Sequence, residues 1–156
     1  MKTIAELIAE QRFFRGLDRD GLDLIAGCGR NVHFAVGQRI LTAGEPADAF
    51  YLLRSGRAAL GFYVPERGTV VVDTLGGGDV LGWSWLFEPY RWQFDADALE
   101  PVSAVAFDAR CLRDKCEADP RLGYLLTQGF ARVMLGRLQS VRLRLLDVYG
   151  TGSGTR

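Results

Sequence analysis

Histidine is almost absent from this chain of 156 residues, because His33 is the only one. Hydrolytic triads depend on a positioned histidine, and the metal sites of cupin-like enzymes usually need several. A cupin-like enzyme is therefore disfavoured, and a haem or gas sensor that uses His33 or a cysteine as axial ligand is a minor alternative. The composition therefore disfavours histidine-based catalysis, and we expect a protein that is not an enzyme.

Paired cysteines and long apolar runs are also missing. Cys28, Cys111 and Cys116 are odd in number and show no CxxC spacing, which predicts three reduced thiols and neither a disulfide framework nor a zinc site. No apolar run reaches the length of a membrane span, and the N-terminus lacks the pattern of a signal peptide. We expect a cytoplasmic protein without membrane contact.

Net charge is zero, since 19 basic residues balance 19 acidic ones. The chain therefore has no overall field that would draw it onto nucleic acid, and any anion has to be bound by local groups. Apolar residues make up 48% of the sequence and charged residues 24%, as in ordinary globular proteins. One domain is expected over residues 1–149, followed by a flexible tail over residues 150–156 that is rich in glycine and polar residues.

The sequence between residues 30 and 108 consists of short apolar runs separated by turn residues, which predicts a β-roll or sandwich. In one of these runs Phe94, Ala96 and Ala98 alternate with acidic residues, which predicts that Asp95 and Asp97 lie on a solvated face. The predicted strands are 32–36, 39–41, 50–53, 58–64, 70–75, 94–99 and 102–107.

Helices are expected on both sides of this β region. Thr3 with Glu6 is the pattern of a capping box, and a second helix should begin near Asp18, so that helices occupy about residues 3–28. After the strands, Asp108 and the pair Asp119-Pro120 are typical helix starts, so that C-terminal helices should cover about residues 109–148.

The last helix carries an apolar seam with heptad-like spacing. Such a seam needs a partner surface, either the β-roll of the same chain or the same helix of a second subunit. The arginines of this helix, in contrast, are expected on a solvated face. The seam residues are Met134, Leu138, Val141, Leu145 and Val148, and the arginines are Arg132, Arg137, Arg142 and Arg144.

Three segments resemble the cyclic-nucleotide-binding domain of catabolite-activator and FNR-type regulators. They are residues 44–53 followed by Ser55-Gly56, residues 75–82 with the sequence LGGGDVLG, and residues 83–93, which stand where this family has its phosphate-binding cassette. The likeness runs from about residue 10 to residue 149. It implies a mainly β fold with flanking α-helices: a double-stranded β-helix, or jelly roll, with N-terminal helices and a long C-terminal helix.

The resemblance also implies a binding site for cyclic AMP or cyclic GMP. A cyclic phosphate keeps its negative charge at physiological pH, so that burying it requires a positive group and inward backbone N–H groups. Arg91 stands where the family has its phosphate-binding arginine, and Gly82 stands at the entrance of the cassette. The predicted ligand-binding residues are Gly82, Trp83, Ser84, Arg91, Trp92 and Gln93.

Two positions depart from the family pattern. Trp83 replaces the glutamate that accepts a hydrogen bond from the ribose, and an indole has no acceptor. Trp92 replaces a small or hydroxyl residue, and Glu88 is a carboxylate that could supply the missing acceptor. The aromatic residues of the cassette either offer flat faces to an aromatic ligand or fill the interior of the roll, and both interpretations stay open. They are Trp83, Trp85, Phe87, Tyr90, Trp92 and Phe94.

Two functions follow from these patterns. The first is a non-catalytic regulatory module that binds a cyclic nucleotide, or a related anionic or aromatic ligand, and signals through its C-terminal helix. The alternative is a degenerate family member that binds no small molecule and acts as a dimerisation or docking module. In both cases we expect a protein partner or a homodimer through the C-terminal helix. Direct DNA binding is not expected, because no helix-turn-helix pattern follows.

Overall fold

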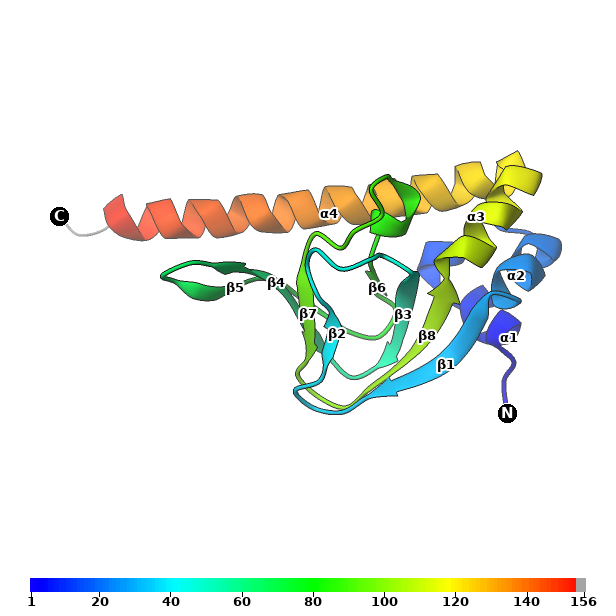
Figure 1. The fold of residues 1–156 in the computed structure, drawn as a ribbon, viewed down its shortest axis with the longest axis horizontal. Coiled ribbons are helices and arrows are strands. Elements are labelled where there is room, and N and C mark those ends of the chain that lie inside the picture. Colours follow the sequence, from blue (N-terminus) through cyan, green and yellow to red (C-terminus); the bar gives the residue numbers. More distant parts are fainter. Residues whose placement is uncertain (154–156) are drawn as a thin grey trace.

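The computed structural model describes the backbone of residues 1–153 and the side chains of residues 1–147. Within these residues, eight strands form two antiparallel sheets that enclose a roll, with short helices at one end and a long helix along one side (Figure 1). The first sheet has the strand order β1-β8-β3-β6, and the second has the order β2-β7-β4-β5. The predicted jelly roll with flanking helices is confirmed.

The strands follow the apolar runs of the sequence. Only β6 falls outside the predicted runs, because its two residues, paired with Tyr51 and Leu52 of β3, are too few to show a period. The strands are β1 (Gly29–Phe34), β2 (Arg39–Leu41), β3 (Ala49–Ser55), β4 (Ala58–Val64), β5 (Gly68–Leu75), β6 (Val80–Leu81), β7 (Asp95–Ala98) and β8 (Val102–Asp108).

The helices begin at the predicted caps. Thr3 and Glu6 form the capping box, and the carboxylates of Asp18 and Asp108 accept from the first turns of α2 and α3. The last helix continues into the stretch predicted as a tail, and residues 154–156 lie outside the described residues. The helices are α1 (Ile4–Ala9), the 3₁₀ turn η1 (Arg12–Phe14), α2 (Arg19–Ala26), the 3₁₀ turn η2 (Ser84–Leu86), α3 (Ala109–Ala118) and α4 (Pro120–Ser153).

The hydrophobic core has two parts, which lie on opposite faces of the first sheet. The outer core packs this sheet against the helices, and the inner core fills the space between the two sheets. The largest buried side chains of the outer core are Phe50, Trp85, Phe107 and Phe130, and those of the inner core include Leu41, Leu53, Leu60, Leu81 and Trp92.

The prediction of three reduced thiols is wrong for two of them. Cys28, between α2 and β1, and Cys111, in α3, form a disulfide with their Cα atoms 5.7 Å apart, whereas Cys116 is free. The paired cysteines are 83 residues apart, and their spacing therefore has no local signature. The pairing of β1 with β8 brings them together, since Gly29 lies opposite Phe107 and the Asp108 N–H donates to the Cys28 carbonyl at 2.9 Å.

The prediction of a solvated face for Asp95 is also wrong. Asp95 is only 9% exposed, because the chain after β2 folds over it. Its carboxylate accepts a hydrogen bond of 2.8 Å from the Ala43 N–H and lies 3.1 Å from the guanidinium of Arg39. Asp97 is more accessible, and it accepts a bond of 2.6 Å from Nε of the same arginine.

The described residues offer neither a membrane span nor a metal site. None of their helices is both long and apolar enough to cross a membrane. No group of three or more histidine, cysteine, aspartate or glutamate side chains in this part of the chain could hold a metal ion.

Candidate functional site

The cassette between β6 and β7 is fixed to the turn that precedes β3. The Trp92 N–H donates to the Glu45 carbonyl at 2.9 Å, and the Ala47 N–H donates to the Tyr90 carbonyl at 2.7 Å. Within the cassette, η2 is a single 3₁₀ turn over Ser84–Leu86. The backbone of the predicted site is therefore held against this turn.

The Arg91 side chain lies at the surface, beside the same turn. It is exposed, and its Nη1 donates to the Gly44 carbonyl at 2.9 Å. Gln93 is exposed too, and its Nε2 donates to the Arg91 carbonyl at 3.2 Å. Glu88, the candidate replacement for the missing acceptor, is likewise exposed. The ligand-binding roles of Arg91 and Gln93 stay predictions.

Trp92 occupies the interior of the roll. Its side chain is 6% exposed and belongs to the inner core. The ring lies directly against Gly82: a Cβ built on this glycine would be 2.5 Å from Cζ3 of Trp92. Gly82 also has a φ of +89°, a backbone conformation that favours glycine. The indole therefore lies against the residue that the resemblance assigns to the ligand phosphate.

Almost no space remains around this indole. The cavity lined by Leu60, Leu81, Gly82 and Trp92 has a volume of about 10 Å³. Such a volume holds about one water molecule. A cyclic nucleotide therefore does not fit inside the roll in this conformation.

The other aromatic residues of the cassette lie in different places. Trp85 is fully buried in the outer core and stacks on Phe50, with ring centroids 5.7 Å apart. Trp83 is half-buried and meets Phe94 edge to face at 5.6 Å, beside α4. Ser84 is buried at 6% exposure. Of the two interpretations of the aromatic residues, the geometry favours filling of the core.

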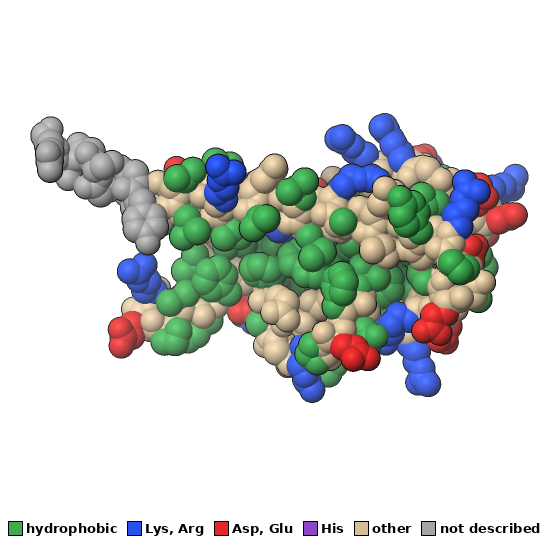
Figure 2. All heavy atoms as spheres, turned by 90° about the horizontal axis from the view of Figure 1, so that it is seen from above, with side chains coloured by type: hydrophobic (Ala, Val, Ile, Leu, Met, Phe, Trp, Pro, Cys, Tyr) green, Lys and Arg blue, Asp and Glu red, His purple; other side chains and the backbone are tan. Residues whose placement is uncertain are grey.

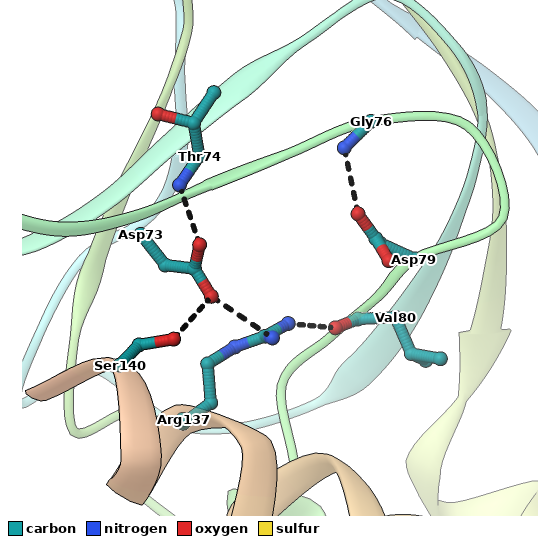
Figure 3. Close-up of polar contacts among 7 residues, drawn as sticks. All are labelled: Asp73, Thr74, Gly76, Asp79, Val80, Arg137 and Ser140. Atoms are coloured by element: carbon teal, nitrogen blue, oxygen red, sulfur yellow. Dashed lines mark hydrogen bonds and ion pairs between the residues drawn. The ribbon is translucent and has the colours of Figure 1, made fainter. Parts of the chain in front are cut away.

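An arginine of the last helix contacts the mouth of the roll, where the sequence predicts only solvated arginines. The side chain of Arg137 is 12% exposed, and its Nη1 lies 3.3 Å from the Asp73 carboxylate (Figure 3). Nη2 donates to the Val80 carbonyl at 3.0 Å, and the Ser140 hydroxyl donates to Asp73 at 3.3 Å. Burial lowers the pKa of the Arg137 guanidinium, and the negative charge of Asp73 opposes this effect. These contacts fix α4 to the end of β5.

Arg144 is exposed, as predicted, but it also donates from Nε and Nη2 to the Val71 carbonyl at 3.0 and 2.8 Å. One signal in the sequence could have shown this. Arg137, Ser140 and Arg144 are three and four residues apart, so that they share one face of the helix. Polar residues that recur on the face turned to a β-roll are candidates for contacts with strand carbonyls.

Comparison with known proteins identifies the fold family. The model of the cyclic nucleotide-binding domain matches residues 31–119, which is more than half of the chain. The chain belongs to the cyclic nucleotide-binding domain family. A solved structure from Geobacter metallireducens, described as that of a cyclic nucleotide-binding protein, superimposes on this domain with a TM-score of 0.77. The two chains are 30% identical, and the match covers 88% of this chain and 99% of the other.

Curated relatives carry this domain as part of longer proteins. The CRP-like cAMP-activated global transcriptional regulator of Mycobacterium tuberculosis is 25% identical over 146 residues, which is 94% of this chain and 63% of the regulator. Glutaminase 1 of Bradyrhizobium diazoefficiens is 33% identical over 134 residues, which is 84% of this chain and 21% of the glutaminase. The domain is thus of a regulatory family and matches parts of proteins with different named activities.

The contact between Gly82 and Trp92 can be tested by substitution. We expect Gly82→Ala to lower the free energy of unfolding by about 2–3 kcal/mol, because the new Cβ overlaps the indole and the residue keeps a left-handed φ. Urea denaturation followed by circular dichroism measures this loss.

A double-mutant cycle supplies the control. In a Trp92→Ala background the overlap is gone, so Gly82→Ala should cost about 1–2 kcal/mol, mostly for the backbone conformation. Equal costs in both backgrounds would contradict the contact.

Proposed function

We propose that this cyclic nucleotide-binding domain is a regulatory association module, in which Trp92 closes the β-roll and α4 pairs with α4 of a second copy. The proposal rests on the position of the indole. A family member that senses a ligand inside its roll needs an open interior, whereas here a side chain of the protein fills it. The same indole stabilises the roll without a ligand, so the domain can present α4 in the absence of one.

The surface that remains for association lies along α4. Large apolar side chains are exposed there, with Leu135 at 55%, Leu138 at 66% and Leu145 at 54%. Beside them is an apolar groove of about 480 Å³, whose lining includes Trp83, Phe94 and Leu138. Figure 2 shows apolar side chains gathered on this face between α4 and the roll. Burying one leucine side chain is worth about 1.5–3 kcal/mol, so this surface can drive association.

A second copy of the chain fits this surface for two reasons. Leu138 and Leu145 are seven residues apart, the spacing at which paired helices repeat their contacts. The end of α4 also extends beyond the β-sheets, where no other element of the described chain covers it (Figure 1). The side chain of Val148, the last residue of the predicted seam, lies outside the described side chains.

Titration of the purified chain with cyclic AMP and cyclic GMP tests the closed roll. We expect no heat of binding and no change in melting temperature, because the interior has no room for either nucleotide. A real ligand at 100 times its Kd would add about 2.7 kcal/mol to the free energy of unfolding, which is easily detected. Saturable binding of either nucleotide would contradict the proposal.

Such binding would instead support the second candidate function, a cyclic nucleotide sensor in which Trp92 moves out of the roll. Gly82 and Arg91 favour this candidate, because both stand at the family positions that the resemblance assigns to the phosphate. The name of the Mycobacterium tuberculosis relative, a cAMP-activated regulator, favours it as well.

A further inference from the structure

A second, polar cavity lies outside the β-roll. It is formed between η1, the turn before β6 and the middle of α4, and its volume is about 320 Å³. Three arginines line it, Arg12 from η1 with Arg132 and Arg137 from α4, together with one carboxylate, that of Asp79. This is a different place from the interior of the roll that Trp92 fills.

Three guanidinium groups line the cavity beside one carboxylate, and Arg137 is also paired with Asp73, so that one positive charge is left in excess. The carboxylate of Asp79 is already engaged, because it accepts a hydrogen bond of 2.8 Å from the Gly76 N–H (Figure 3). Arg12 and Arg132 are exposed, and neither side chain forms a hydrogen bond or ion pair with any described residue. Several N–H donors in the cavity are therefore available to a guest.

Arg137 adds a donor that is already desolvated. Its Nε is buried and has no hydrogen-bond partner among the described residues, although the two terminal nitrogens of the same guanidinium are bonded. A buried donor without a partner costs free energy, and a rearrangement of this side chain toward an acceptor in the cavity would relieve the cost. The positive charge of Arg137 also contributes to the electrostatic potential in this cavity.

A glycine on α4 keeps this cavity open. A Cβ built on Gly136 would meet no atom within 4 Å, so that packing inside the chain does not explain a glycine at this position. Glycine in the middle of a helix is unfavourable compared with alanine. Gly129, in contrast, is explained by packing, because its Cβ would lie 3.1 Å from the Phe13 ring. The open space above Gly136 is therefore available to a molecule from outside.

We propose that this cavity binds a small phosphate-bearing anion. The side chains of Arg12 and Arg132 are free to bind a phosphate group, and the planar fork of arginine bonds two phosphate oxygens at once. Phe13 and Val133 provide an apolar wall for an organic part of the ligand. A volume of about 320 Å³ is within the range of small-molecule sites.

Calorimetry on the full chain with inorganic pyrophosphate and with AMP, at constant ionic strength in chloride, tests the proposal. We expect saturable binding of both probes. Arg132→Gln should weaken binding by about tenfold or more, because it removes a charge-assisted contact. Arg142→Gln is the matched control, an exposed arginine of the same helix outside the cavity, and it should leave the affinity within about twofold.

Gly136→Gln is a second test that does not depend on charge. Its side chain should fill the cavity and weaken the binding of both probes, while helicity, measured by circular dichroism, is kept or increased. The absence of saturable binding to the unmodified chain would overturn the proposal, and so would an affinity that Arg12→Gln, Arg132→Gln and Gly136→Gln all leave unchanged. Citrate binding as tightly as pyrophosphate would show that the ligand class is wrong. None of these results bears on the closure of the roll by Trp92. AMP binding in the cavity outside the roll should persist in Trp92→Ala.

Discussion

Replacing Trp92 with alanine should lower the free energy of unfolding by about 3–5 kcal/mol, the usual cost of truncating a buried tryptophan. The cost is large because the indole is 6% exposed and packs on Gly82 and the apolar side chains of both sheets. The remaining cavity is lined mainly by leucine and alanine, and such apolar cavities bind small aromatic molecules. Indole added in solution should therefore raise the melting temperature of the variant and leave that of the unmodified chain unchanged.

Trp83→Ala is the matched control for this experiment. Trp83 belongs to the same cassette but is half-buried at the surface groove beside α4, so its loss should cost less and create no closed cavity. A Trp92→Ala variant that loses under about 1 kcal/mol and binds no indole would show that this side chain does not fill the roll. Cyclic AMP is the second probe, since binding gained only in Trp92→Ala would show that the indole blocks the ligand position of the family.

The double variant Leu138→Arg with Leu145→Arg should convert the proposed dimer to a monomer. Each leucine is exposed in the single chain, and its burial in a dimer would contribute about 1.5–3 kcal/mol. The double variant loses this contribution and places two positive charges of each copy opposite those of the other, so that the copies repel each other. We expect a rise of at least about a hundredfold in the dimer dissociation constant. Analytical ultracentrifugation over a range of concentrations measures this change.

Leu143→Arg is the control for this pair. Leu143 is exposed to a similar degree, at 63%, but lies two positions from Leu145 and therefore on another face of the helix. Its substitution should leave the dissociation constant nearly unchanged. A chain that is monomeric at all concentrations, or one that Leu143→Arg disrupts as strongly as the double variant does, would contradict pairing through the seam.

The local features of this fold can be predicted from the sequence because they depend on neighbouring residues. The capping box of Thr3 and Glu6 and the caps at Asp18 and Asp108 each need only a short segment, and all are confirmed. The same holds for the strands that alternate with turn residues. Asp95 shows the limit of such local patterns, since its burial comes from a hydrogen bond with Ala43, far away in the sequence.

The orientation of the cassette side chains could not be predicted in this way. Tyr90 has a φ of +54°, which breaks the regular alternation just before Arg91 and Trp92. The backbone conformation at Tyr90 therefore determines which of the next side chains points into the roll, and the strand-like alternation of side chains does not. The resemblance assigns Arg91 to the ligand, whereas in this conformation its guanidinium bonds to the Gly44 carbonyl and the neighbouring indole lies inside.

The disulfide between Cys28 and Cys111 links the N-terminal helices to the C-terminal helices. It joins the segment between α2 and β1 covalently to α3, and Lys115 of α3 adds a hydrogen bond of 2.6 Å to the Leu24 carbonyl. A displacement of α3 relative to α2 is therefore restricted. Between α3 and α4 only Asp119 leaves the helical conformation, with φ −129° and ψ 89°. Asp119 is therefore the hinge at which a rotation of the long helix against the rest of the domain would be concentrated.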